Sequence, residues 1–200
     1  MRISDFAGRM GQTLLGAYAT FAPWEVTSQL EAIIGDAIAG LAPGYRVSGL
    51  QAVHQSATIE EGAKLKGPLI IGPQCLVACA AYLRGGVFMD EDCRVGPGGE
   101  LKSTIMLLAS SLAHLNFVGD SILGAGVNLE AGAVIANYRN ERPDKRIQFN
   151  YCGARIDTGV DKFGAMVGDR VRIGANAVIA PGAALDIGTI VPRLSLVDMG

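Results

Sequence analysis

The chain is poor in charge, in aromatic residues and in long apolar runs, and each shortage excludes a class of protein. Charged residues make up 18% of its 200 residues, the net charge is −2 and no long basic run occurs, so nucleic acid is not an expected partner. No apolar run approaches the roughly 18 residues that a membrane-spanning helix needs. The first residues also make a poor signal peptide. The sequence therefore predicts a cytoplasmic protein without a membrane span.

Histidine and cysteine, the usual zinc ligands, do not occur in metal-binding patterns. The four cysteines show neither zinc-site nor redox spacing. The two histidines are His54 and His114, fewer than the three that a zinc site of the γ-carbonic-anhydrase type requires. We therefore expect no metal in the functional site, and we expect His54 to be structural or exposed.

What the chain does contain is a six-residue period of aliphatic residues. The period runs from Val53 to Leu101, resumes from Phe117 to Ile135 and returns from Val167 to Val191, with small residues four positions after most of its members. It fits neither an amphipathic helix nor a simple strand. It is typical of a solenoid of short strands and tight corners, and roughly eighteen repeats at three per coil predict about six coils.

Two segments lie outside the period. Residues 1–50 contain an apolar helical spacing from Leu30 to Leu41, with Thr27 as a candidate N-cap. Because stacked repeats need covered ends, we expect residues 1–50 to form a helical cap segment. Residues 51–200 are expected to form an all-β solenoid domain with a loop insertion at about 136–166. Such insertions extend from one face and often carry function.

Polar residues gather around the breaks in the period. His114 is the natural general base, because imidazole titrates near neutral pH. From its position alone, a corner or surface histidine without a catalytic role is an equally good interpretation. A carboxylate such as Glu100 could orient the imidazole. Arg84, Lys102 and Lys162 could hold an anionic group such as a phosphate, whereas each of them taken alone could be a solvated surface charge.

The stretch from Glu100 to Tyr138 resembles a known family. The segments Glu100-Leu-Lys102, His114-Leu-Asn-Phe-Val-Gly-Asp120 and Gly126-Val-Asn-Leu-Glu-Ala-Gly132 are similar to the acetyltransferase domain of bifunctional N-acetylglucosamine-1-phosphate uridyltransferase. They resemble archaeal-type sugar-1-phosphate nucleotidyltransferase/acetyltransferases still more closely. The resemblance covers about residues 50–192. It implies a left-handed parallel β-helix of hexapeptide repeats, a homotrimer with the site between neighbours, and acetyl-CoA as cosubstrate.

The resemblance also implies catalytic roles. His114 would take the proton of the acceptor amine, and Glu100 would support that histidine. The backbone N–H near Ala131 would meet the oxyanion that forms on the thioester carbonyl. The amine would attack the thioester directly, without a covalent enzyme intermediate.

The remaining carried-over residues belong to the substrates. The resemblance places the sugar phosphate at Arg84, Lys102 and Lys162, the sugar at Asn128, and acetyl-CoA at Asn137, Tyr138 and Ala175. Phe117 is a substrate-binding position where the family commonly has tyrosine, and the loss of a hydroxyl partner can change substrate preference. The loop after Tyr138 is also different and more basic. The acceptor is therefore left open between glucosamine 1-phosphate, galactosamine 1-phosphate and a nucleotide-linked aminosugar.

We predict an acetyl-CoA-dependent N-acetyltransferase that acts on an aminosugar 1-phosphate or a nucleotide aminosugar. Residues 1–50 carry no Gly-rich nucleotide-binding motif, so the expected activity is acyl transfer alone. One alternative is an O-acyltransferase that acts on a nucleotide sugar with an acyl-carrier-protein thioester. The Asn137-Tyr138 block argues against it, because this block matches the enzymes that use acetyl-CoA better. Another alternative is a non-catalytic trimeric scaffold that binds a sugar nucleotide. The presence of the family's site residues argues against it: Glu100, Lys102, His114 and Asn128.

Overall fold

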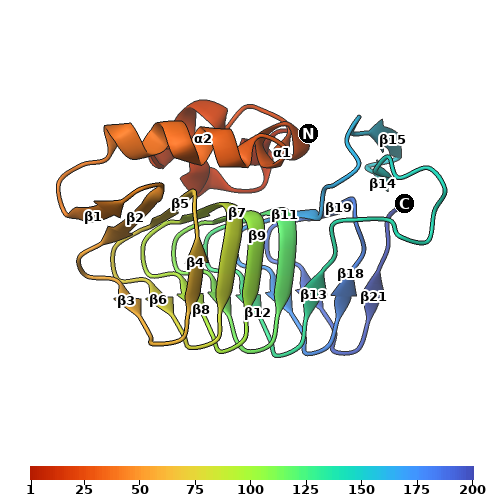
Figure 1. The fold of residues 1–200 in the computed structure, drawn as a ribbon. Coiled ribbons are helices and arrows are strands. Elements are labelled where there is room, and N and C mark those ends of the chain that lie inside the picture. Colours follow the sequence, from red (N-terminus) through yellow and green to blue (C-terminus); the bar gives the residue numbers. More distant parts are fainter.

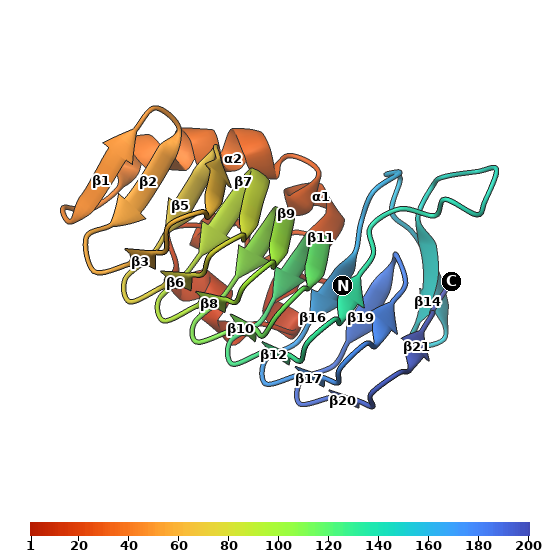
Figure 2. The ribbon, with the colours of Figure 1, turned by 60° about the horizontal axis from the view of Figure 1, so that its bottom comes forward.

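In the computed structural model, which describes residues 1–200, most of the chain winds into a solenoid of parallel strands (Figure 1). Each coil has a short strand on each of three faces, named here the covered, narrow and open faces. The narrow face is a seven-stranded sheet with one strand per coil, and its strands lie in a row along the solenoid (Figure 2). They are β3 (Thr58–Ile59), β6 (Leu76–Val77), β8 (Arg94–Val95), β10 (Ser111–Leu112), β12 (Asn128–Leu129), β17 (Arg172–Ile173) and β20 (Ile190–Val191).

The open and covered faces share one sheet, because three long strands bend around the corner between them. These are β7 (Tyr82–Met89), β9 (Glu100–Met106) and β11 (Phe117–Leu123), whose first halves lie on the open face. The open face also holds β4 (Lys64–Lys66), β13 (Val134–Ile135), β18 (Val178–Ile179) and β21 (Leu196–Val197). The covered face also holds β1 (Tyr45–Ser48), β2 (Gln51–His54), β5 (Leu69–Ile71), β16 (Ala165–Val167) and β19 (Ala183–Leu185).

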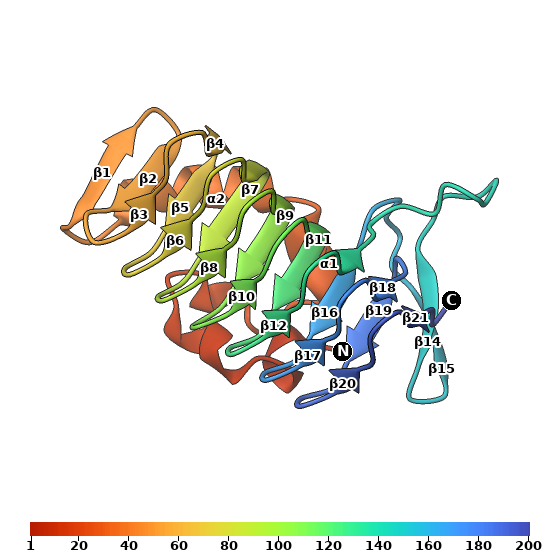
Figure 3. The same cartoon turned by 90° about the horizontal axis from the view of Figure 1, so that it is seen from below.

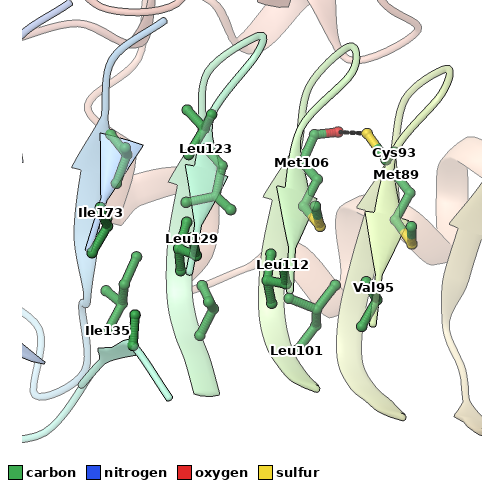
Figure 4. Packing of buried hydrophobic residues seen from close by; sticks show 14 of the residues in the cluster. Met89, Cys93, Val95, Leu101, Met106, Leu112, Leu123, Leu129, Ile135 and Ile173 are labelled. Atoms are coloured by element: carbon green, nitrogen blue, oxygen red, sulfur yellow. Dashed lines mark hydrogen bonds between the residues drawn. The ribbon is translucent and has the colours of Figure 1, made fainter. Parts of the chain in front are cut away.

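The six-residue period marks the inward-facing position of each strand. A cluster of 29 buried residues fills the solenoid, and the inward side chains of successive coils stack along its axis (Figure 4). Val95, Leu112 and Leu129 form one such stack, which the pairing of β8, β10 and β12 holds in register. The predicted fold class, a left-handed parallel β-helix of hexapeptide repeats, is confirmed in its period and strand order. The narrow face shows seven coils, however, where the sequence predicted about six.

The additional coil was hidden by two shortened corners. After Leu101 and again after Val118, a single residue in the left-handed region makes the turn, Ser103 with φ 47° and Asp120 with φ 46°, and the period shortens there by one residue. The pairing of Val118 with Leu101 is preserved across these corners. Val118 is therefore the fully buried residue, whereas Phe117, which the sequence analysis placed in the period, lies on the open face.

The N-terminal helical segment runs along the covered face, not over the end of the solenoid where the sequence placed it (Figure 1). The reason is a second apolar row on that face. Side chains that point away from the interior, such as Phe88 and Ile105, are buried in a cluster with Leu30 and Ile34 of the helical segment. Thr27 ends a first short helix and does not cap a continuous one. The elements are η1 (Ile3–Asp5), η2 (Gly8–Gln12), η3 (Gly16–Tyr18), α1 (Pro23–Thr27), α2 (Leu30–Ala37) and η4 (Ile38–Gly40). All are too short to serve as a membrane span.

The insertion lies between β13 and β16, where the loop was expected, and it contains a hairpin of β14 (Gln148–Tyr151) and β15 (Ala154–Asp157). This hairpin lies beside β21 and the C-terminus (Figure 3), and the Asn150 N–H donates to the Met199 carbonyl at 2.6 Å. Phe149 and Phe163 pack against Trp24 of α1, with ring centroids 6.0 and 5.7 Å apart. The insertion therefore connects the helical segment to the last coils.

Candidate active site

Three residues with predicted catalytic or cofactor roles line up at one corner of successive coils. His114, Ala131 and Ala175 follow the narrow-face strands β10, β12 and β17, which pair in register. The Gly132 N–H donates to the His114 carbonyl at 2.9 Å, and the Asn176 N–H donates to the Ala131 carbonyl at 3.0 Å. Successive members are therefore separated by about 4.8 Å along the solenoid axis. We call His114, Ala131 and Ala175 the corner row.

The members of the corner row differ in what they bind within the chain. The His114 side chain is exposed, so its imidazole is accessible to a substrate. The Ala131 N–H has no acceptor in the chain, as an oxyanion donor requires. The Ala175 N–H, by contrast, donates to Glu130 Oε2 at 2.9 Å. The hydrogen bond from Arg193, followed by that from Ala175, holds the pKa of Glu130 below its usual value, so this carboxylate remains an acceptor.

Two cations of the open face, Arg84 and Lys102, are held by carboxylates on neighbouring strands. Arg84 Nη2 lies 2.6 Å from Glu100 Oε1, and Arg84 Nε donates to the same oxygen at 2.8 Å. Both side chains point outward from the paired strands β7 and β9, which explains why they meet. Glu100, which was expected to support His114, is therefore engaged with the guanidinium, and its role at the base stays a prediction.

Asp120 is a site residue that the sequence analysis did not assign. It is almost fully buried, and its carboxylate accepts hydrogen bonds from Lys102 Nζ at 2.7 and 2.9 Å and from Asn137 Nδ2. Asp120 is the single left-handed residue at the corner of β11, and that conformation turns its side chain toward both partners. The sequence signal that could have identified Asp120 is its position at the end of the segment His114–Asp120, which resembles the family. Asp120 thus positions one predicted phosphate ligand and one predicted acetyl-CoA contact.

Six of the predicted residues line one cavity of about 410 Å³ on the open face. They come from three successive strands and from both ends of the insertion: Arg84, Lys102, Phe117, Asn137, Tyr138 and Lys162. Lys145 Nζ lies 5.1 Å from the centroid of the Tyr138 ring, so a cation of the basic loop also approaches the site. The cavity combines cations, an amide and aromatic rings, which suits an anionic and hydroxylated ligand.

The helical segment forms a wall of the adjoining space. A second cavity, of about 360 Å³, shares Lys102 and Lys162 with the first and is closed by Thr27, Ser28 and Glu31. The Thr27 hydroxyl is buried there without a hydrogen-bond partner. The helical spacing of residues 1–50 does not indicate this placement, because it does not show which surface of the solenoid the segment covers. The structure places three of their polar side chains beside the predicted phosphate lysines.

Asn128 lies apart from the open-face cavity. It is exposed on the narrow face, where its Oδ1 accepts a hydrogen bond from the Ser111 hydroxyl at 2.7 Å. It lines a separate cavity of about 240 Å³ with Glu130, Arg172 and Arg193. Within one chain, the predicted sugar contact and the predicted phosphate ligands therefore lie on different faces, which meet near the corner row.

Comparison with known proteins relates this arrangement to a family. No family model matches the chain. The bifunctional sugar-1-phosphate nucleotidylyltransferase/acetyltransferase of Sulfurisphaera tokodaii is 31% identical over 140 residues, which cover 70% of this chain and 34% of the relative. The bifunctional protein GlmU of Methanococcus vannielii is 34% identical over 118 residues, which cover 59% of this chain and 28% of the relative. The chain is therefore similar to part of these bifunctional sugar-phosphate enzymes, over 118 to 140 of its residues.

The chain spans about a third of the length of the curated relatives it matches. The resemblance found in the stretch from Glu100 to Tyr138 is thereby confirmed. Among solved structures, a mutant of the GDP-perosamine N-acetyltransferase from Caulobacter crescentus, in complex with CoA and GDP-perosamine, has a TM-score of 0.33 and 16% identity, covering 72% of this chain and 51% of that chain.

Proposed function

We propose that the chain transfers an acetyl group from acetyl-CoA to the amine of an aminosugar that carries phosphate at its anomeric carbon. The observation that carries the proposal is the open-face cavity, in which Arg84, Lys102 and Lys162 lie together with Asn137 and Tyr138. Charge-assisted hydrogen bonds from such cations are the usual means of holding a phosphate. The neighbouring corner row supplies the groups that acyl transfer needs.

The chemistry assigned to the corner row is direct transfer. The amine nitrogen of the sugar attacks the thioester carbonyl carbon, and His114 accepts the proton that the nitrogen loses. The negative charge that develops on the carbonyl oxygen is stabilised by the unoccupied Ala131 N–H. The carbon–sulfur bond then breaks, and the CoA sulfur takes the proton from His114. Because the transfer is direct, the proposal assigns no role to an enzyme thiol.

We further propose that the enzyme is a homotrimer with its site between neighbours. In one chain Asn128 lies on the narrow face and the phosphate ligands lie on the open face, so a neighbour's open face set against this corner would complete the site. Large apolar side chains near the same edge in the last coil support such a contact, because Leu194 is 80% exposed and Leu196 is 66% exposed. Exposed apolar residues of this kind are suited to the core of an interface.

The test is an acetylation assay with a matched pair of histidine variants. The purified chain is incubated with acetyl-CoA and a panel of aminosugar 1-phosphates and nucleotide aminosugars, and mass spectrometry detects an added acetyl group. We expect turnover on at least one acceptor, and His114→Ala should reduce kcat by about 10²–10⁴-fold. His54→Ala, in β2 on the first coil, should leave it unchanged.

Two outcomes would overturn the proposed function. One is the absence of acetylation on every acceptor together with a failure to bind acetyl-CoA. The other is equal activity of the wild-type chain and a folded, trimeric His114→Ala variant.

A further inference from the structure

The open face continues beyond the phosphate cavity as a groove over the first two coils. This groove has a volume of about 750 Å³ and is lined by Lys64, Lys66 and Tyr82. The pairing of β4 with β7 sets Lys66 beside Arg84, and the pairing of β7 with β9 sets Arg84 beside Lys102. Lys66, Arg84 and Lys102 therefore form a straight row of cations, one per coil, at spacings of about 4.8 Å.

The charges along this face are compensated unequally. Arg84 is paired with Glu100, and Lys102 is paired with Asp120. Lys64, Lys66 and Lys162 take part in none of the ion pairs of the chain, and Lys64 and Lys66 are exposed. Uncompensated positive charge thus lies in two places, at Lys162 beside the predicted sugar phosphate and at Lys64 and Lys66 in the groove. A single phosphate would use only the first.

An aromatic ring stands in the groove beside the cations. Tyr82 is the register partner of Lys64, and the Arg84 guanidinium lies 5.6 Å from the centroid of its ring. Bases of nucleotides stack on aromatic side chains and on arginine planes. Cations at successive spacings with an aromatic ring beside them suit the diphosphate and the base of a nucleoside diphosphate.

The direction of the groove assigns this nucleotide to the acceptor. Ala175, the predicted contact of acetyl-CoA on the corner row, lies on the sixth coil. Lys66 lies on the first coil, on the other side of the phosphate cavity along the axis. A donor that extends from the corner row past Ala175 therefore leads away from the groove, whereas a group attached to the sugar phosphate at Arg84 leads into it.

We propose that Lys64, Lys66 and Tyr82 bind the nucleotide part of a nucleoside-diphosphate aminosugar. The acceptor is then nucleotide-linked, and an aminosugar 1-phosphate occupies only part of its site. The choice of acceptor rests on the proposed acetyl transfer, but the binding of a nucleoside diphosphate does not.

The first test measures nucleotide binding without turnover. Uridine, thymidine and guanosine diphosphates are titrated into the intact chain by calorimetry, with CoA in a parallel titration. We expect at least one nucleoside diphosphate to bind, Lys66→Ala to weaken its binding about tenfold, a factor that corresponds to 1.4 kcal/mol, and Tyr82→Ala to weaken it similarly. Arg94→Ala removes an exposed positive charge from the narrow face and should have no effect.

The second test compares two acceptors of the same aminosugar, one nucleotide-linked and one a 1-phosphate. Lys66→Ala should raise KM for the first about tenfold and leave KM for the second and both kcat values unchanged. Acetylation of the 1-phosphate without binding of any nucleoside diphosphate would overturn this inference and leave the proposed function standing. Lys66-dependent nucleotide binding without any acetylation would overturn the proposed function and leave this inference standing. Weaker CoA binding by the Lys66 variant would assign the groove to the donor and also overturn the inference.

Discussion

Replacing Asp198 by asparagine should loosen the insertion that carries Asn137 and Tyr138. The Arg139 guanidinium, which is 2% exposed, contacts both Asp198 oxygens at 2.6 and 2.9 Å and donates to the Pro181 carbonyl at 2.7 Å. Asp198 follows the last strand of the solenoid, so this pair fixes the start of the insertion to the seventh coil. Asp198→Asn keeps the shape of the side chain and removes its charge.

The size of the effect follows from the pKa of Asp198. Hydrogen bonds from Arg139 lower the pKa of this carboxyl from its ordinary value of 3.8 to about 2. For a fully buried group, that difference corresponds to about 2.5 kcal/mol of folding free energy. Asp198 is 36% exposed, so solvent screening reduces the expected loss in Asp198→Asn to about 1–1.5 kcal/mol at pH 7. Because the folded-state pKa is the lower one, this stabilisation is complete above about pH 4 and is lost as the pH falls toward 2.

Urea unfolding of the wild-type chain and of Asp198→Asn at several pH values between 7 and 3 measures this directly. The difference in unfolding free energy should be constant from pH 7 to 5 and should shrink below pH 4. Asp92→Asn is the control, since its pair with Arg94 is exposed on both sides and 3.4 Å long, and it should change stability little. The reasoning is refuted if the two variants lose the same free energy, or if the difference for Asp198→Asn does not depend on pH.

Three further predictions concern the site, the core and the interface. Asp120→Asn removes the counter-ion that positions Lys102 and should lower kcat/KM for a phosphorylated acceptor about tenfold; an unchanged or higher value would mean that this ion pair does not position the lysine. Leu112→Ala, in the coil that the sequence analysis overlooked, should cost about 2–5 kcal/mol in urea unfolding, and a cost below about 1 kcal/mol would contradict its core placement. Leu196→Arg should convert the proposed trimer to monomers in light scattering, and a trimer that persists would remove this residue from the proposed interface.

The solenoid could be predicted from the sequence because a short local repeat determines its fold. Each inward position is occupied by an aliphatic residue and each corner by a small or left-handed one, so the period survives without knowledge of tertiary contacts. The count of coils failed where a single left-handed residue replaced a longer corner, as at Ser103 and Asp120. A corner of that kind changes the spacing by one residue, which a fixed period cannot follow.

Other features depend on contacts between distant parts of the chain. The helical spacing of residues 30–41 shows that one face is apolar but not which surface it covers, and the outward side chains Phe88 and Ile105 decide that. The pairing of Glu100 with Arg84 follows from a register between coils. The family resemblance supplied the list of site residues, whereas their division between a corner row, an open-face cavity and the narrow face required the three-dimensional path of the chain.

The helical segment changes how the repeats lose their structure. In a repeat array that has contacts only between neighbours, coils can fray one by one from either end. Here Arg9 binds Asp90 on the third coil, and the Asp169 N–H on the sixth coil donates to the Phe6 carbonyl at 3.0 Å. Because one continuous stretch of chain is bonded to both coils, the sixth cannot open without releasing contacts made by residues next to those that hold the third. The solenoid should therefore unfold as a single cooperative unit, with one transition in place of the gradual melting of a linear array.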